Sequence, residues 1–472
     1  MKKLKHTVKI ERDEYGMARF ITAYKTAAQR KLEGKNKRNE ISRESHAEFE
    51  PVSDRTDPVE VIKKSSEGRW KHLIPIRYGR MSKTPFTFLR GSASLMAMDI
   101  ATTATPDIRV QACGDCHLSN FGLFATPERN LIFDINDFDE TLPAPFEWDI
   151  KRLATSFYVA SLDNRFSEKD CKIATRRCVT AYREAIAAFA SMKVLDVWYA
   201  KYDIETAIAQ APDAEAKRRR QLMAEKAKST VTESVFPKIT QVIGGKRSIV
   251  DQPPLIYHPP HDLKLPEGLI PVFEMYRETL PYERRLLLDR FHIEDLAIKV
   301  VGIGSVGTLC GVILLMAEEK DPLILQIKEA NLSVLEPYAG KSDFKHHGER
   351  VVVGQRLMQS ASDMLLGWAT GAGKDHRHFY IRQLKDMKFS FDIGMMNSLQ
   401  LCRYAEVCGW TLARAHARSG DAAMISGYVG KTDVFDRAIG TFARIYAEQT
   451  EKDFEVFTGA IESGEIKAEM EQ

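Results

Sequence analysis

The chain has 472 residues, 44% of them hydrophobic and 28% charged, which is the composition of a soluble globular protein with room for two or three lobes. Its formal net charge of +3 is close to balance, so we expect no nucleic-acid partner. The polar N-terminus lacks the apolar core of a secretory signal, and no apolar run could span a bilayer. The seven cysteines show no disulfide framework, so a cytoplasmic protein without membrane contact is predicted.

The first half of the chain is predicted to be mainly helical. Residues 1–54 are polar and helix-prone, and we expect a loosely attached extension there. Residues 55–249 are predicted to form a helical lobe that carries two polar loops. The expected elements of this lobe are a helix over 59–73, turns around a short strand over 80–91, a helix over 92–100, strands over 108–112 and 131–133, and mainly helical segments over 146–191 and 194–243.

After a proline-rich connector over 250–271, the residue pattern changes from mainly helical to mainly strand-like. Residues 272–395 are predicted to form a small β lobe, and residues 396–472 to be helices that complete the helical lobe. The expected elements of the β lobe are strands over 298–301, 309–316, 323–327 and 379–384 and a helix over 349–368. The fold class expected from this order is α+β with two lobes.

The segment 114–120, Gly-Asp-Cys-His-Leu-Ser-Asn, has the residue types of a phosphotransfer loop. Asp115 can accept a proton from a hydroxyl, Asn120 can hold a metal, and His117 would lie near phosphates. The segment C-x-x-C-H within this loop also fits a c-type haem attachment site, a thiol redox pair or a zinc ligand pair, but no second C-x-x-C follows. We favour the phosphotransfer interpretation.

The segment 133–140 places four acidic residues directly after a short apolar strand. Crowded carboxylates repel one another unless a cation is present, and a hard ion such as Mg²⁺ suits oxygen ligands. Asp137 precedes a Phe as in the Asp-Phe-Gly motif of kinases, so it is the predicted metal ligand. An acidic surface turn is the alternative. Asp149 is expected to brace the fold, and His416 to be a core or capping histidine.

A second group of motifs lies almost two hundred residues later. Gly302, Gly304 and Gly307 form a G-x-G-x-x-G that precedes a β-prone run and not a helix, so we expect a strand–glycine loop–strand hairpin that covers phosphates. A dinucleotide-binding turn or a turn without a ligand are the alternatives. Lys328 ends the next apolar strand, where kinases place the lysine that binds the α- and β-phosphates, unless it simply faces solvent.

The lysine would need an acidic partner. Glu349, Glu329 and Glu336 are candidates, and Glu349 is preferred because it opens the next long helix. Charged residues after the last predicted strand line the cleft or are solvated loop charges; they are Arg382, Lys385, Asp386 and Lys388.

Several further segments are distinctive when taken together: PIRYGRM (75–81), PFTFLRG (85–91), GDCHLSNFG (114–122), NDFDE (136–140), FEWD (146–149), VGIGSVGT (301–308), GQRLMQ (354–359), RQLKDMK (382–388) and ARAHARSG (413–420). They resemble a bacterial family called domain of unknown function 2252, and the resemblance runs from about residue 55 to the C-terminus. This family implies no established activity.

The two loops also resemble those of the aminoglycoside and choline phosphotransferase branch of the protein-kinase-like fold. By that resemblance Asp115 matches the catalytic base, Asn120 and Asp137 the metal ligands, and Asp149 a later structural Asp. Those enzymes run from glycine loop to catalytic loop, whereas this chain has the catalytic loop first, and Cys113 stands where that branch often has His. A circular permutation would reconcile the two orders.

The sequence therefore predicts a two-lobed, kinase-like α+β fold in permuted order, with ATP and Mg²⁺ bound between the lobes. Phosphate would pass to a hydroxyl of a small-molecule substrate, with Asp115 as base and Lys328 and the glycine loop on the phosphates. The alternatives are a nucleotide-binding regulator without turnover, a metal-dependent hydrolase or nucleotidyl transferase centred on Asp115 and Asp137, and a scaffold protein without a small ligand.

Overall fold

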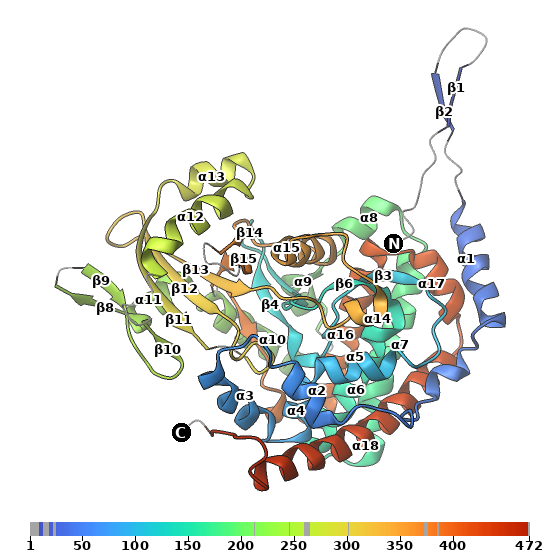
Figure 1. Cartoon of the computed structure of the whole chain (residues 1–472). Coiled ribbons are helices and arrows are strands. Elements are labelled where there is room, and N and C mark those ends of the chain that lie inside the picture. Colours follow the sequence, from blue (N-terminus) through green and yellow to red (C-terminus); the bar gives the residue numbers. More distant parts are fainter. Residues whose placement is uncertain are drawn as a thin grey trace.

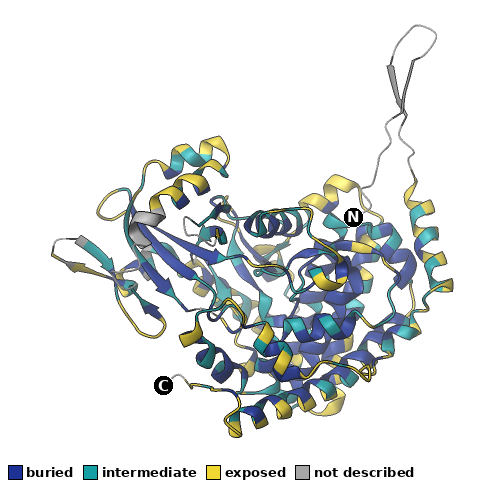
Figure 2. Ribbon diagram, viewed as in Figure 1, coloured by how far each residue is buried: buried dark blue, intermediate teal, exposed yellow. Residues whose placement is uncertain are grey.

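The structure, a computed structural model, describes residues 9–12, 18–21, 25–211, 213–244, 246–258, 265–300, 302–371, 376–384 and 387–470. It is an α+β protein in which a six-stranded antiparallel sheet lies beside a larger helical body (Figure 1). The strands of the sheet and the central helices of the body are mostly buried (Figure 2). Among the described helices, none combines the length and the apolar character needed to cross a membrane.

The helices of the described chain fall mainly before residue 240 and after residue 397. They are α1 (Ala27–Asn36), α2 (Pro58–Lys64), α3 (Ile74–Met81), α4 (Pro85–Gly91), α5 (Ala93–Ile100), α6 (Phe146–Asp163), α7 (Glu168–Phe189), α8 (Val194–Tyr199), α9 (Ile204–Ala209), α10 (Ala214–Lys228), α11 (Thr232–Ile239), α12 (Leu265–Glu278), α13 (Tyr282–Leu288), α14 (Glu336–Ala339), α15 (His347–Met358), α16 (Ser398–Ser419), α17 (Ala422–Val429) and α18 (Val434–Glu462).

The strands form one large sheet and several smaller ones. They are β1 (Lys9–Arg12), β2 (Ala18–Ile21), β3 (Arg109–Ala112), β4 (Phe121–Ala125), β5 (Leu131–Ile135), β6 (Leu142–Pro145), β7 (Tyr202–Asp203), β8 (Thr240–Ile243), β9 (Lys246–Ile249), β10 (Ile256–Tyr257), β11 (His292–Lys299), β12 (Cys310–Met316), β13 (Pro322–Glu329), β14 (Gly367–Thr370), β15 (His378–Gln383) and β16 (Phe389–Ser390).

The six-stranded sheet has the order β10-β11-β12-β13-β15-β14, with every neighbouring pair antiparallel. Every residue of β12 is buried, because both faces of the sheet are covered. On one face Val272, Tyr276 and Leu280 of the α12 region pack against Ile313 and other strand residues. On the opposite face apolar side chains from residues 236–256 pack against Val312 and Leu314. These residues join the sheet, although the sequence assigned most of them to the helical lobe.

The helical body forms around α6, α7, α16 and α18, which share one large hydrophobic core. Close approach of α7 and α16 depends on Gly409, because a Cβ there would lie 2.1 Å from the carbonyl oxygen of Cys178. Helix α15 packs against β14 and β15 on one side and against α16 on the other, so it connects the sheet to the body (Figure 1).

The N-terminal segment differs from the expectation of a loosely attached extension. Helix α1 packs against α17 so closely that a Cβ on Gly34 would lie 1.9 Å from the carbonyl oxygen of Met424. His46 and Phe49 are buried, and Phe49 belongs to the main core. The polar composition reflects the exposed side of a helix whose other side is covered, and this prediction was wrong for residues 27–49.

Three predicted elements end or differ for local reasons. The helix predicted over 59–73 ends at Lys64, and Gly68 adopts a φ of +77° in the turn that follows. The strand predicted within 80–91 is helical, because Thr84 forms a capping box and Pro85 occupies the first turn of α4. The helix predicted over 349–368 ends at Met358.

The remaining predicted elements are confirmed in type. Strands β3, β5, β12, β13 and β15 and the three C-terminal helices lie where the sequence placed them, and β11 starts earlier than predicted. Strand β16, which follows β15 in the chain, pairs with β4 in the body. Lys385 and Asp386, predicted to line the cleft or to be solvated, lie outside the described residues.

Candidate functional site

The loop after β3 is fixed by Asp149, in the first turn of α6. Its carboxylate accepts the backbone N–H of Cys113 at 2.7 Å and of Gly114 at 3.0 Å. Gly114 has a φ of +86°, and a Cβ there would lie 2.3 Å from the carbonyl oxygen of Glu140, so only glycine fits. His416 Nε2 lies 3.2 Å from Asp149 and is fully buried. Asp149 and His416 therefore brace this loop from the core; the sequence predicted Asp149 to brace the fold and His416 to be a core or capping histidine.

Asp115 is held at one oxygen by an arginine that sequence reasoning missed. Arg152 Nε and Nη2 lie 2.6 and 2.5 Å from Oδ1 of Asp115, whereas Oδ2 lies 3.8 Å from Nε2 of His117. Burial raises the pKa of Asp115, and the charge of Arg152 opposes this shift. Arg152 lies three residues after Asp149 on α6, so helical spacing could have placed it on the same face.

His117 is buried beside two cations. Burial, then the charges of Arg90 and Arg152, hold its pKa well below the usual value, so the imidazole is neutral at pH 7. A neutral imidazole can donate or accept a hydrogen bond but cannot supply a positive charge to phosphates.

Asn120 connects the first loop to the second. Its Nδ2 donates to the carbonyl oxygen of Asp115 at 2.7 Å, so Oδ1 is the atom it can offer to a cation. The backbone N–H of Asn136 donates to the carbonyl oxygen of Asn120 at 2.8 Å. The Sγ–H of Cys113 donates to the carbonyl oxygen of Asp137 at 3.3 Å, while the side chain of Asp137 remains 36% exposed. The Asp137 carboxylate is thus held on a fixed loop yet accessible.

Lys328 reaches the same acidic loop from the six-stranded sheet. Its side chain is almost fully buried at the end of β13, with Nζ 2.6 Å from Oδ2 of Asp139 and 3.9 Å from Oδ1 of Asp137. Asp139 also accepts the Tyr380 hydroxyl at 2.5 Å and the Ser305 hydroxyl at 3.3 Å. Burial lowers the pKa of Lys328, but the two carboxylates outweigh it and raise that pKa well above its usual value.

The acidic partner of Lys328 is Asp139, which corrects the preference for Glu349. Glu349 lies in the first turn of α15, where its N–H donates to His346 Nδ1. The neighbouring Arg350 is the α15 residue that turns inward, and its guanidinium donates to the main-chain oxygens of Asp139 and Thr141. Glu329 points to the other side of β13, where it accepts the N–H of Leu309.

The glycine loop joins β11 to β12 and is fastened from the helical body. Gly302 and Gly307 have φ values of +65° and +87°, which favour glycine. Arg69 Nη1 donates to the carbonyl oxygens of Gly304 at 2.7 Å and Val306 at 2.6 Å. Arg80 donates to the carbonyl oxygen of Gly302. Arg69 and Arg80 therefore engage the carbonyls of this loop.

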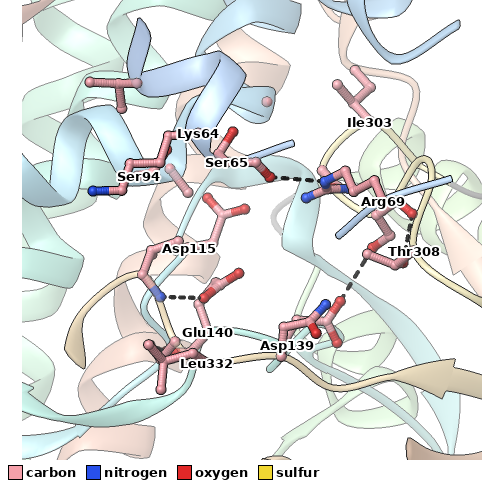
Figure 3. A pocket seen from close by; sticks show the side chains of 18 of the residues that line it. Lys64, Ser65, Arg69, Ser94, Asp115, Asp139, Glu140, Ile303, Thr308 and Leu332 are labelled. Carbon is pink, nitrogen blue, oxygen red and sulfur yellow. Dashed lines mark hydrogen bonds between the residues drawn. The ribbon is translucent and has the colours of Figure 1, made fainter. Parts of the chain in front are cut away.

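Two adjoining cavities lie between the glycine loop and the acidic loop. The larger, of about 930 Å³, is lined by Asp115, His117, Asn120, Asp137, Gly302 and Gly304 among others. The smaller, of about 550 Å³, is lined by Phe124, Asp137, Lys328, Gln326 and Leu384 among others. Figure 3 shows Asp115, Asp139 and Glu140 around a pocket, with Arg69 across it from Asp115. Of the predicted site residues, Gly307 and Glu349 line neither cavity.

The oxygen ligands present suit Mg²⁺. This ion usually binds one or two carboxylates and completes its shell with water and phosphate oxygens, and Asn120 and Asp137 offer such a partial set. Within the described chain, no group of three or more His, Cys, Asp or Glu side chains converges as a metal site. All seven cysteines are free thiols, and Cys113 and Cys116 are buried in the main core.

Comparison with known proteins gives one match. A family model described as an uncharacterized protein conserved in bacteria (DUF2252) matches residues 69–460. No curated protein and no solved structure shows significant similarity to the chain. The matched range includes both loops, the glycine loop, Lys328 and Arg69. The chain belongs to the bacterial DUF2252 family.

Proposed function

We propose that this protein is an ATP- and Mg²⁺-dependent phosphotransferase that acts on a hydroxyl of a small molecule. The observation that carries the proposal is the ion pair between Lys328 and Asp139, two residues separated by 189 positions. Ser305 of the glycine loop donates to the same carboxylate. The two groups of phosphotransfer motifs, far apart in sequence, therefore meet around one acidic loop.

The topology supports a kinase-like fold in permuted order. The glycine hairpin β11–β12 is followed by the lysine strand β13, the helix α15 and two further strands of the same sheet. Such a sheet with one helix is the arrangement expected for the nucleotide-binding lobe of a kinase. The chain then enters the body, where β4 and β5 separate the catalytic loop from the acidic loop. This order of elements supports the proposal of a kinase-like fold whose elements the chain visits in another order.

The two cavities suggest how ATP would lie. The smaller cavity is lined by Phe124, Gln326 and Leu384, which offer apolar and amide surface to a base. The phosphates would extend past Lys328 to Asp137, which lines both cavities. The larger cavity, with Asp115 on its wall, would then hold the acceptor. Mg²⁺ bound by Asp137 and Asn120 would neutralise the phosphates.

In the proposed transfer the acceptor hydroxyl oxygen forms a bond to the γ-phosphorus as the bond to the β,γ-bridging oxygen breaks. The hydroxyl proton passes to Oδ2 of Asp115, and ADP leaves. Arg152 fixes Oδ1 of Asp115, so the other oxygen is the one presented to the acceptor. Phosphoryl transfer needs mainly positioning and charge neutralisation, which this site offers.

Thermal stabilisation by ATP tests the proposal. Purified protein should show a rise in melting temperature with ATP that requires Mg²⁺ and is reduced in Asp137→Ala and Lys328→Ala. Lys320→Ala and Asp321→Ala, in the exposed turn between β12 and β13, are matched controls that should respond like the wild type. Absence of a shift at millimolar ATP would reject the nucleotide site and favour a metal-centred hydrolase at Asp115 and Asp137.

One observation favours a second candidate, a nucleotide-binding regulator without turnover. Asp115 is paired through Oδ1 with Arg152, and this charge opposes the rise in the pKa of Asp115 that burial causes, so the carboxylate is a weaker base than burial alone would make it. Release of ADP separates the candidates. A regulator would bind ATP with the same Mg²⁺ and Lys328 dependence but release no ADP with any hydroxyl acceptor.

A further inference from the structure

Arg77 and Arg90 line the larger cavity, and Arg152 lies behind them against Asp115; the three arginines have different partners. Arg77 donates to the carbonyl oxygen of Gly91 at 2.8 Å, and Arg152 donates to that of Leu89 at 2.9 Å and to Asp115. Arg90 lies between these acceptors, in the last turn of α4. Among the described residues it has no hydrogen-bond or ion-pair partner, and its Nε is buried without one. The guanidinium carbon lies 5.9 Å from the centroid of the Phe86 ring.

Arg90 lies where the proposed reaction would take place. It lines the larger cavity together with Asp115, Asn120 and Asp137. Its main-chain oxygen lies 3.8 Å from the position of a Cβ added to Gly304, so the end of α4 lies next to the glycine loop. Burial lowers the pKa of Arg90, whereas the charges of Asp115 and Asp137 oppose that shift, so the guanidinium remains charged at pH 7.

A largely buried guanidinium without a partner is unfavourable, because the charge has lost water and gained no hydrogen bond. The neighbouring Arg77 and Arg152 donate hydrogen bonds to main-chain oxygens, as expected of structural arginines. Arg90 has five N–H donors arranged for an oxyanion such as phosphate. The missing partner of Arg90 is therefore an anionic group that enters the cavity.

We propose that Arg90 binds the γ-phosphoryl group of ATP and accompanies it during transfer, an inference that rests on the phosphotransferase function proposed above. Phosphorus–oxygen bond formation to the acceptor and cleavage of the β,γ-bridge place negative charge on the transferred group. Arg90 donates hydrogen bonds to those oxygens from the acceptor side, while Lys328 and Mg²⁺ act from the nucleotide side. An anionic group on the acceptor has the same chemistry, and the experiment distinguishes the two sources.

The test compares ADP with a non-hydrolysable ATP analogue, each with Mg²⁺, by calorimetric titration of the wild type, Arg90→Gln and Arg90→Lys. Loss of hydrogen bonds to a charged group should weaken binding of the analogue to Arg90→Gln on the order of tenfold or more. Binding of ADP, which lacks the γ-phosphoryl group, should change less than about twofold, because no other contact is altered. Arg90→Lys should recover part of the lost affinity.

Arg176→Gln is the matched control, because Arg176 forms a surface ion pair with Asp433 and should bind both nucleotides like the wild type. The melting temperature of each ligand-free variant shows whether it has folded. Equal weakening of ADP and the analogue in Arg90→Gln would overturn the inference and make Arg90 a structural residue. Unchanged binding of both would also overturn it, and would point to the acceptor as the source of the anion. Absence of nucleotide binding by the wild type would instead reject the proposed function itself.

Discussion

The loop around Asp115 and the glycine loop around Gly304 are positioned in opposite ways. The Asp115 loop is anchored by its own helical body, since Asp149 accepts two of its N–H groups and Arg152 holds Asp115. The glycine loop connects two strands of the six-stranded sheet but is anchored from the helical body, through Arg69 and Arg80.

This difference suggests that the two loops are held with different rigidity. A loop whose backbone is bonded to a buried carboxylate belongs to the core, so its geometry should persist with or without a ligand. A loop of the sheet that is held by long cationic side chains from the helical body depends on how the sheet and the body approach each other. Substitutions in the two anchors should therefore affect stability and nucleotide binding in different proportions.

Asp149→Ala should have the largest effect on stability. It leaves the N–H groups of Cys113 and Gly114 without an acceptor in the core, and we expect a loss of about 3–5 kcal/mol in the free energy of unfolding. Urea denaturation measures it. Asp433→Ala, which removes an exposed carboxylate, should lose less than about 1 kcal/mol. Similar values for the two variants would contradict the core anchoring of this loop.

Lys328→Met should cause the second largest loss of stability, and the size of that loss should depend on pH. Burial raises the pKa of Asp139, but Lys328 and the Tyr380 hydroxyl outweigh it and lower that pKa below its usual value. The pair therefore contributes stability above the unfolded pKa of Asp, about 3.9, and loses it as pH falls through the lower folded value.

We expect Lys328→Met to lower the free energy of unfolding by about 3 kcal/mol at pH 7. The loss should be smaller at pH 4, because Asp139 can take up a proton in the variant. Denaturation at both pH values checks this, with Lys320→Met as the exposed control. A loss that is the same at both pH values would show that the pair with Asp139 does not determine the effect.

Arg69→Ala should lower the free energy of unfolding less than Lys328→Met does, but it should also weaken the binding of ATP. It removes the donor to the carbonyl oxygens of Gly304 and Val306, for a loss of about 1–2 kcal/mol in the free energy of unfolding. Because the glycine loop would cover the phosphates, affinity for ATP should fall several-fold. Titration with ATP measures this, and unchanged affinity would mean that the loop does not need this anchor.

Glu140 gives a smaller, pH-dependent effect. Burial, only partly offset by the N–H of Val334 and the charge of Arg350, raises the pKa of Glu140 to about 7. Its folded pKa exceeds the unfolded value, so the stability it contributes is complete below about 4.5 and falls as pH rises towards 7. In Glu140→Gln the fall in the free energy of unfolding with rising pH should be smaller by on the order of 1 kcal/mol. Melting temperatures at pH 5 and pH 8 test it, and an unchanged slope would refute it.

Glu349→Ala should have the smallest effect. Since Asp139 and not Glu349 pairs with Lys328, ATP affinity should change less than about twofold and stability less than about 0.5 kcal/mol. Titration beside Lys328→Met makes the comparison. A loss of affinity close to that of Lys328→Met would restore Glu349 as a partner of the lysine in the nucleotide-bound protein.

Local sequence signals explain which elements were predictable. Strands such as β5 and β12 were found because continuous apolar runs bounded by turn residues are typical of buried strands. Helix α4 was missed because aromatic residues and Pro85 were taken as turn and strand signals, whereas the Thr84 capping box starts a helix there. The attachment of α1 was missed because its composition is polar, and only the close packing of Gly34 on α17 reveals it.

The sequence by itself determined the α+β class, the two loops with Asp115 and Asp137, the glycine hairpin and the lysine strand, because spacing and residue type are local properties of the chain. Only the tertiary structure decided that Lys328 pairs with Asp139, that Arg152 holds Asp115 and that Arg69 fastens the glycine loop. Each of these pairs joins different segments of the fold. Which partner a buried charge obtains depends on the packing of both lobes, and one local pattern cannot specify it.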